Sequence, residues 1–272
     1  MSRAGLCAIA VMAKAPRAGS VKTRLVPPLT FDQARALSAA FLRDTTENIA
    51  AAGRLAPIEG FVAYAPAGSE ASFEGALAPS TGFVLADGSV PAPPRVQGFG
   101  RCLLHAAEGL LERGYGAACV LNSDSPTLPT AQLVRAARAL LAKGDRTVLG
   151  AASDGGYYLL GVKAAHARLF EDVDWSTDRV AEQTRARAAE LGLETVELDP
   201  WYDVDDRTAL ARLTAELSAA NAIAAGDGVP YAAPFTADCL RRLAALEWTP
   251  ERAVESAVAA PNAVPLARRA VS

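Results

Sequence analysis

The stretch from residue 117 to residue 130 constrains the fold of this chain more than any other. An apolar run (117–121) leads into the loop sequence Asn-Ser-Asp-Ser-Pro (122–126), and a helical apolar pattern begins near Thr130. A proline cannot continue a sheet ladder, so the middle of the stretch is a turn. In open α/β sheets, ligands bind beyond the carboxyl ends of the strands. Asp124 is therefore predicted to lie at a ligand-binding edge; the alternative is that it only caps the turn.

The first 31 residues carry five cations and no acid. The run 6–12 is uniformly apolar, which is typical of a strand covered on both faces of a parallel sheet. It leads into a loop (13–25) that contains Lys14, Gly19, Lys22 and Arg24. Glycine and repeated cations after a first strand favour phosphate binding, although a solvated basic loop is the alternative. The loop is not a Walker A motif, because no glycine precedes Lys22 directly.

Strands and helices alternate along the rest of the chain. We predict further strands at 61–64, 83–85, 117–121, 147–150, 157–161 and 195–198, and helices at 32–52, 101–113, 130–141, 178–191, 207–217 and 236–246. Ser176 or Thr177 is the predicted N-cap of the helix 178–191. The length suits one large α/β domain, or one domain plus an appendage. The residues become small and linker-like beyond residue 218, so we expect a domain at 1–217 and a helical extension with a loose tail at 218–272.

Aspartates also follow two later strands. Asp154 begins an Asp-Gly-Gly turn, where it could be only the turn residue or could face a substrate. Asp203 and Asp205 follow the last predicted strand and project the same way if the segment is extended. Asp206 is expected only to cap the next helix. Such an acidic cluster repels itself unless water or a cation neutralises it.

Composition excludes several classes of protein. A formal net charge of −3 argues against a general nucleic-acid binder, and no apolar run approaches transmembrane length. The four cysteines show no metal-like spacing, which indicates reduced core thiols in a cytoplasmic protein. His105 and His166 have no ligand partner at a useful spacing.

Five motifs in order resemble a known family. They are the loop 14–25, Ser-Asp-Ser-Pro (123–126), Asp-Gly-Gly-Tyr-Tyr-Leu-x-Gly (154–161), Trp-Ser-Thr (175–177) and Asp-Val-Asp (203–205). Together they resemble the bacterial glycosyltransferase-like family linked to arsenosugar biosynthesis, over about residues 7–213. That family is similar to the nucleotide-diphospho-sugar transferases of GT-A fold and, more distantly, to phospholactate and molybdopterin guanylyltransferases. Ala18 and Ala151 replace prolines that are usual in the family.

The resemblance implies an α/β fold of GT-A type, a three-layer sandwich with a mostly parallel central sheet. It also implies a divalent cation, Mg²⁺ or Mn²⁺, held by Asp124 and Asp205. On the same basis we expect Lys22 and Asp154 to be catalytic. The expected nucleotide and phosphate contacts are Lys14, Gly19, Lys22, Arg24, Gln97 and Ser123, and the expected acceptor or sugar contacts are Asp154, Gly155, Gly156, Trp175 and Thr177.

The expected activity is metal-dependent transfer of a sugar from a nucleotide sugar to a small-molecule acceptor. One alternative is a nucleotidyltransferase that acts on a nucleoside triphosphate and a small phosphorylated or phosphonylated substrate. Another is a non-catalytic nucleotide-binding protein. The helix 236–246 could pack on its own domain or on a second copy, so a homodimer is also an option.

Overall fold

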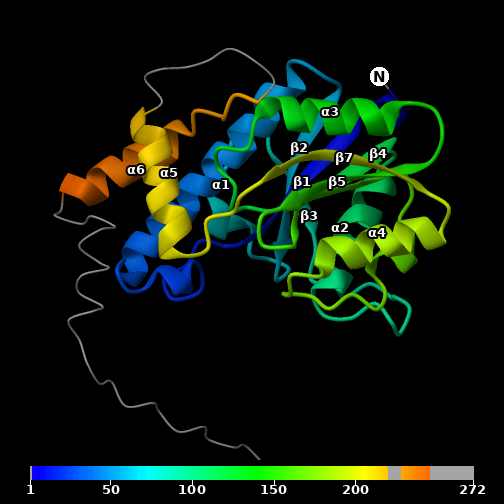
Figure 1. Cartoon of the computed structure of the whole chain (residues 1–272), viewed down its shortest axis with the longest axis horizontal. Helices are drawn as coiled ribbons and strands as arrows, with labels where there is room; N and C mark the ends of the chain where they lie inside the picture. Colours follow the sequence, from blue (N-terminus) through cyan, green and yellow to red (C-terminus); the bar gives the residue numbers. More distant parts are fainter. Residues whose placement is uncertain (1, 220–227, 246–272) are drawn as a thin grey trace, which may run out of the picture.

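A seven-stranded sheet forms the centre of the molecule in the computed structural model, which describes residues 2–219 and 228–245 (Figure 1). The strands are β1 (Cys7–Lys14), β2 (Ile58–Ala65), β3 (Gly82–Leu85), β4 (Ala117–Leu121), β5 (Arg146–Ala152), β6 (Tyr157–Val162) and β7 (Glu194–Trp201). They lie in the order β3-β2-β1-β4-β6-β5-β7, and the middle of the sheet is fully buried, as the uniformly apolar β1 and β4 require.

Only β6 runs against the other strands of this sheet. It pairs antiparallel with both β4 and β5, whereas the remaining pairs are parallel. The carboxyl ends of β1, β4, β5 and β7 therefore meet at one edge of the sheet. The loops that follow these four strands carry the cations and aspartates selected from the sequence, and the topology brings those loops together.

Helices cover both faces of the sheet. They are α1 (Phe31–Gly53), α2 (Phe99–Leu111), α3 (Thr130–Leu141), α4 (Val180–Glu190), α5 (Arg207–Ala219) and α6 (Pro234–Ala245). Apolar side chains of α1 and α3 pack on one face, and those of α2 and α4 pack on the other. The result is a three-layer α/β sandwich, as predicted. None of the helices within residues 2–219 and 228–245 combines the length and apolarity that crossing a bilayer requires.

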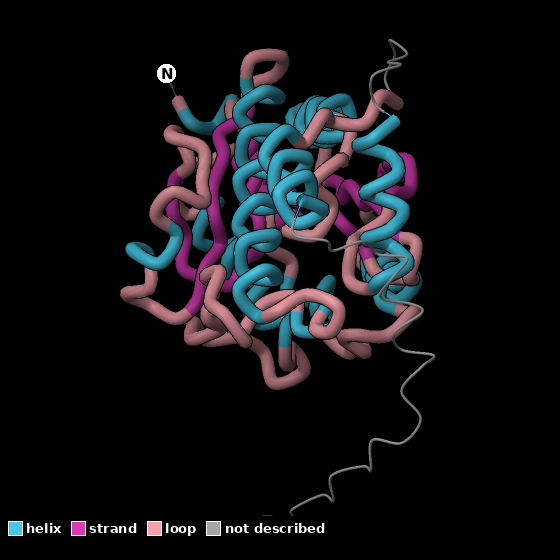
Figure 2. The backbone as a smooth tube through the Cα atoms, turned by 90° about the vertical axis from the view of Figure 1, so that its left-hand side faces the viewer, coloured by secondary structure: helices cyan, strands magenta, loops and turns pink. Residues whose placement is uncertain are grey.

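A third apolar cluster joins α5 and α6 to the outer side of α1. Leu240 and Leu243 of α6 contact this cluster, and the side chain of Asp44 in α1 accepts hydrogen bonds from the first backbone N–H groups of α6. Figure 2 looks at the molecule from the side of α5 and α6, with helices in front of the strands. Thus α6 packs on its own chain. The boundary at residue 217 and a homodimer stay predictions, and the predicted loose tail that follows α6 lies outside the described residues.

Several predicted boundaries need correction. Helix α4 begins at Val180 with Arg179 as its N-cap, so neither Ser176 nor Thr177 caps it. The Thr177 hydroxyl instead accepts a hydrogen bond from the Arg179 N–H within the preceding turn. Strand β7 continues through Trp201, beyond the predicted end at residue 198, because it pairs with β5 as far as Ala152. The predicted cap of α5 is confirmed, since Asp206 accepts a hydrogen bond from the Ala209 N–H.

Candidate active site at the carboxyl edge of the sheet

A cavity of about 480 Å³ lies at the edge where β1, β2 and β4 end. One part of its wall is charged and the other part is largely apolar. The charged part consists of Lys14, Lys22, Arg24, Asp124 and Asp205, together with the hydroxyls of Ser20, Thr23 and Ser123. The other part includes Met12, Ala63, Tyr64, Ala65, Ala86, Phe99 and Cys102.

Lys22 joins the three loops that form the charged part. Its Nζ lies 2.7 Å from Oδ1 of Asp124 and 3.1 Å from Oδ1 of Asp205, and it donates a hydrogen bond of 2.7 Å to the backbone oxygen of Val204. The ring of Phe41 lies below the ammonium, with its centroid 5.2 Å away. The side chain is only 6% exposed, so this is a buried cation with oxygen partners.

The backbone of Lys22 adopts an unusual conformation. Its φ of 49° and ψ of 35° place it in the left-handed region, which costs a residue other than glycine about 1–2 kcal/mol. The contacts of the ammonium offset this cost. The loops after β4 and β7 are also joined directly, because the N–H of Val204 donates a 2.8 Å hydrogen bond to the backbone oxygen of Asp124. The three loops therefore form one connected structure.

The carboxylates at this edge perturb one another. Burial, and next the charge of Asp124, raise the pKa of Asp205, while Lys22 acts in the opposite direction. Burial also raises the pKa of Asp203 to about 6, with further contributions from the charges of Asp154, Asp205 and Asp124. The four aspartates thus share one electrostatic environment, and a positive charge there is strongly favoured.

Asp124 and Asp205 are the residues that could hold a divalent cation. Carboxylate oxygens are the ligands that Mg²⁺ and Mn²⁺ prefer, so the chemistry of this pair fits the predicted metal. Across residues 2–219 and 228–245, no group of three or more His, Cys, Asp or Glu side chains is arranged to hold a metal ion. The described residues therefore supply two carboxylates for a cation at this edge, those of Asp124 and Asp205, and both already contact Lys22.

The apolar part of the cavity includes an exposed aromatic ring. Phe99 at the start of α2 is 50% exposed, and its ring meets the indole of Trp175 edge to face with centroids 6.0 Å apart. The indole also covers Gly100, where an added Cβ would lie 2.8 Å from its Nε1. Trp175 thus supports the start of α2, and Phe99 is the ring that faces the cavity.

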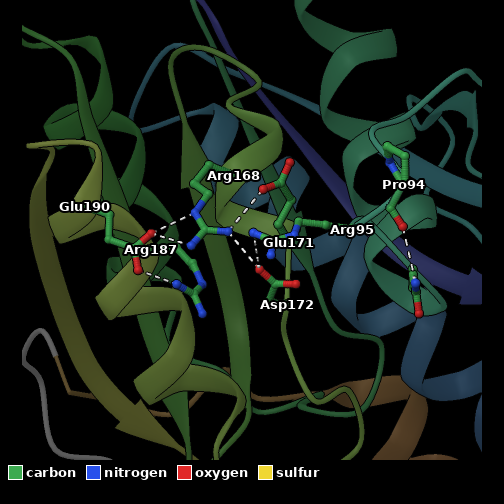
Figure 3. A network of polar contacts seen from close by, with 8 residues as sticks. Pro94, Arg95, Arg168, Glu171, Asp172, Arg187 and Glu190 are labelled. Atoms are coloured by element: carbon green, nitrogen blue, oxygen red, sulfur yellow. Dashed lines mark hydrogen bonds and ion pairs between the residues drawn. The ribbon is translucent and has the colours of Figure 1, made fainter.

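A polar network holds the segment before α2 against the segment before α4 (Figure 3). Arg168 contacts Glu190 at 2.6 Å, Asp172 at 2.9 Å and Glu171 at 3.1 Å, and Arg95 contacts Asp172 from the other side at 3.3 Å. These contacts raise the pKa of Arg168 and hold the pKa of Asp172 and Glu190 below their usual values. The network fixes the position of the segment that leads to Phe99.

The turn between β5 and β6 carries Asp154, whose side chain accepts a 2.9 Å hydrogen bond from the N–H of Gly156. Gly155 has a φ of +90°, and a Cβ there would lie 2.1 Å from the backbone oxygen of Asp178. Asp154 therefore acts as a turn residue and is also close enough to raise the pKa of Asp203.

The predicted site residues fall into two groups. Those that share the cavity wall are Lys14, Lys22, Arg24, Ser123, Asp124 and Asp205. The wall, as far as the described residues form it, does not include Gly19, Gln97, Asp154, Gly155, Gly156, Trp175 and Thr177. The Gln97 side chain donates a hydrogen bond to the backbone oxygen of Pro94, and Thr177 donates one to that of Asp174. Their roles in binding stay predictions.

Sequence reasoning missed the apolar wall. From the sequence, Phe99 precedes a helix, Tyr64 ends a short strand and Cys102 is a core thiol, yet all three line the cavity. A large aromatic directly after Gly98 and directly before a helix was the available signal. Each histidine contacts one aspartate: His105 lies 3.3 Å from Asp87, and His166 lies 2.8 Å from Asp145. All four cysteines are free.

Comparison with known proteins supports the fold. A family model described as "Uncharacterized protein conserved in bacteria (DUF2064)" matches residues 48–177, slightly less than half of the chain. No curated protein matches the sequence. A solved structure from Desulfovibrio desulfuricans G20, described as a "putative nucleotide-diphospho-sugar transferase", is similar over 90% of this chain and 97% of that chain, with a TM-score of 0.70 and 24% identity.

More distant structures show weaker similarity. CMP:2-keto-3-deoxy-manno-octonic acid synthetase in complex with CTP covers 78% of this chain and 98% of its own, with a TM-score of 0.46 and 12% identity. Rv0371c from Mycobacterium tuberculosis H37Rv covers 77% and 98%, with a TM-score of 0.39 and 16% identity. Similarities this low carry no conclusion about the chain. The Desulfovibrio structure confirms the predicted fold class, a three-layer α/β sandwich with a mostly parallel central sheet.

Proposed function

We propose that this protein is a glycosyltransferase that moves a sugar from a nucleotide-sugar donor to a small-molecule acceptor with the help of a divalent cation. The observation that carries the proposal is the charged wall of the cavity. Cations at the end of β1 and in the loop after it line the same cavity as aspartates from the loops after β4 and β7. A nucleoside diphosphate group with a bound divalent cation complements such a wall, because it brings both signs of charge.

The cations of the first loop would stabilise the leaving group. Sugar transfer releases a nucleoside diphosphate, which gathers negative charge in the transition state. Lys14 and Arg24 are exposed residues on the cavity wall, and their charges would neutralise phosphate oxygens. A preorganised electrostatic donor of this kind is worth about 3–4 kcal/mol, or about 10²–10³ in rate.

Asp124 and Asp205 would hold the cation. A bound Mg²⁺ or Mn²⁺ would supply Lewis-acid stabilisation of the diphosphate oxygens. The two aspartates contribute a fixed position for that charge, since the hydrogen bond between Val204 and Asp124 joins their loops.

The apolar part of the cavity would take the nucleoside. Phe99 offers an exposed ring face for a base, and Tyr64 and Ala86 line the same volume. Stacking of a base on an aromatic ring contributes about 1–3 kcal/mol and tolerates different bases. In this proposal the base would lie beside α2 and the diphosphate beside the loop after β1.

The acceptor would approach from the turn between β5 and β6. We propose that Asp154 orients or deprotonates the acceptor hydroxyl, a role suited to a carboxylate at the edge of a site. The specific relation to the arsenosugar family and the cytoplasmic location remain parts of this proposal.

The released product tests the proposal. The purified protein is incubated with Mn²⁺, a panel of nucleotide sugars and candidate acceptors, and in parallel with nucleoside triphosphates and sugar phosphates. Release of a nucleoside diphosphate from a nucleotide sugar supports glycosyl transfer. Release of pyrophosphate from a triphosphate would instead identify a nucleotidyltransferase. Nucleotide binding without either product would indicate a non-catalytic protein.

A further inference from the structure

The ammonium of Lys22 already has a full set of partners. A lysine ammonium has three N–H donors, and three oxygens surround it: one from Asp124, one from Asp205 and the backbone oxygen of Val204. With its side chain 6% exposed, Lys22 differs from Lys14 and Arg24, which are exposed on the same wall. Its position therefore matches that of a counter-ion to the two aspartates.

The two carboxylates that contact Lys22 are the same two that would hold a divalent cation. The Lys22 contacts to Asp124 and Asp205 are made through Oδ1 of each aspartate. An ammonium and a divalent cation at this position would repel each other over a distance of a few ångströms in a partly buried site. Both positive charges therefore cannot occupy the space between these two carboxylates.

The ammonium of Lys22 could instead contact an anionic ligand in the cavity. Lys22 lies on the same cavity wall as two exposed cations, Lys14 at the end of β1 and Arg24 in the following loop, and its four-carbon stem is flexible. An anionic diphosphate in the cavity would accept the ammonium hydrogen bonds that the aspartates give up. After this exchange the two aspartates would be paired with the divalent cation, and the ammonium of Lys22 would be paired with the diphosphate.

We propose that Lys22 is the resident counter-ion of Asp124 and Asp205 in the ligand-free protein, and that a divalent cation binds there by displacing its ammonium, which is thereby released toward the phosphates of the donor. This inference deepens the proposed function and rests on it, because it concerns how the same site takes up its cation. Lys22 would thereby couple metal entry to donor binding.

Metal affinity in single variants tests the exchange. Mn²⁺ binding is measured by electron paramagnetic resonance on the full chain without nucleotide, for the wild-type protein, Lys22→Met and Lys14→Met. Removing the competing ammonium is expected to lower the Kd for Mn²⁺ at least about tenfold in Lys22→Met. Lys14→Met removes the same charge from the same wall and is expected to change the Kd less than about threefold, because no described contact joins it to the aspartates. Unchanged or weaker Mn²⁺ binding in Lys22→Met would overturn the proposal.

A measurement on the wild-type protein covers the case in which Lys22→Met does not fold. Each lysine is acetylated for a short time by an N-hydroxysuccinimide ester, and the extent of modification is read by mass spectrometry. Saturating Mn²⁺ alone is expected to increase the labelling of Lys22 several-fold and to leave Lys14 unchanged. Labelling of Lys22 that stays constant or falls would show that the ammonium does not leave the aspartates.

Neither measurement needs a sugar donor or an acceptor, so the two proposals fail separately. A protein without transfer activity could still show the exchange of Lys22 for Mn²⁺. Conversely, an active transferase in which Lys22→Met binds Mn²⁺ no more tightly would keep the proposed function and lose this inference.

Discussion

Two charged clusters in this protein are built from the same kinds of side chain, but they lie in different surroundings. In each, one cation contacts several carboxylates: Lys22 contacts Asp124 and Asp205, and Arg168 contacts Glu171, Asp172 and Glu190. The Lys22 cluster lies on a cavity wall at the carboxyl edge of the sheet, with the lysine 6% exposed. The Arg168 cluster lies outside that wall, with the arginine 26% exposed.

The difference separates a structural network from a candidate site. The planar guanidinium of Arg168 contacts Glu190 through two of its nitrogens and joins two segments of the chain (Figure 3). Lys22 is a point charge on a flexible stem, which can be exchanged for another cation. The sign of the pKa shifts differs too: Arg168 lowers the pKa of Asp172, whereas burial raises the pKa of Asp203 and Asp205 beside Lys22.

The largest effect is expected when the same substitution is made in each cluster. Asp124→Asn removes the carboxylate charge that would hold the cation, and kcat is expected to fall about 10²–10³-fold, or about 3–4 kcal/mol. Asp172→Asn is the matched control, because asparagine tolerates its positive φ of 52°. It is expected to leave kcat within about threefold of wild type. Steady-state kinetics at saturating Mn²⁺ measures both, and equal losses would remove the distinction between the clusters.

Lysine removal is expected to have the next largest effect, on stability. In EDTA, Lys22→Met leaves two adjacent carboxylates without their counter-ion. Because the aspartates are 31% and 43% exposed, we expect a loss of about 1–3 kcal/mol rather than the larger cost of a fully buried pair. Mn²⁺ is expected to restore most of this loss. Arg168→Met is also expected to be destabilised, and Mn²⁺ should not restore it. Urea unfolding with and without Mn²⁺ measures both; rescue of both variants, or of neither, would contradict the account.

A smaller effect is expected at the apolar wall. Phe99→Ala removes the exposed ring from the cavity, and the KM for the donor is expected to rise about tenfold with little change in kcat, which corresponds to about 1–2 kcal/mol of stacking. Phe235→Ala is the matched control, because this ring is 43% exposed on α6 and packs on Arg43. The KM should stay at its wild-type value in the control. A lower kcat with an unchanged KM in Phe99→Ala would contradict a role of this ring in binding the donor.

The smallest effect concerns pH. Because the folded pKa of Asp203 is raised to about 6, its contribution to stability is fully present below the unfolded pKa and is lost as the pH rises through about 6. Asp203→Asn is therefore expected to gain stability relative to wild type between pH 4 and pH 7, by on the order of 1–2 kcal/mol. For Asp172, whose pKa is lowered, the stabilising contribution is lost as the pH falls, so the cost of Asp172→Asn should shrink toward acid pH. Unfolding free energies in EDTA, measured from pH 7 down to well below the ordinary aspartate pKa of about 4, would show the two opposite trends. The trend of Asp203 lies between about pH 4 and pH 6 and that of Asp172 at lower pH, and parallel trends would contradict the assignment.

Much of the fold could be predicted because the strands carry simple signals. The uniformly apolar runs of β1 and β4 indicate buried parallel strands, and parallel strands end at a common edge. The convergence of Lys22, Asp124 and Asp205 follows from that rule alone. The helix boundaries were less predictable, because local hydrogen bonds in the turns, such as that of Thr177, decide where α4 begins.

The contacts within the site could not be predicted. The sequence indicates that Lys22 and the aspartates share an edge, but their pairing depends on the left-handed backbone of Lys22 and on the hydrogen bond between Val204 and Asp124. The position of Phe99 depends on Trp175, which lies far away in the sequence and covers Gly100. Both features arise from tertiary packing, and no local pattern encodes them.

The central claim is that the cavity beside Lys22, Asp124 and Asp205 binds a nucleoside diphosphate group together with a divalent cation. The most direct test is a thermal-shift titration of wild type and Asp124→Asn with UDP, GDP, CDP, ADP and TDP, each with Mn²⁺ and with EDTA. A ligand that binds only the native state raises its melting temperature. We predict that at least one nucleoside diphosphate with Mn²⁺ raises the Tm of the wild-type protein, and that this shift is lost in EDTA and in Asp124→Asn. The same shift in Asp124→Asn as in wild type, or no shift with any of the five nucleotides, would contradict the account.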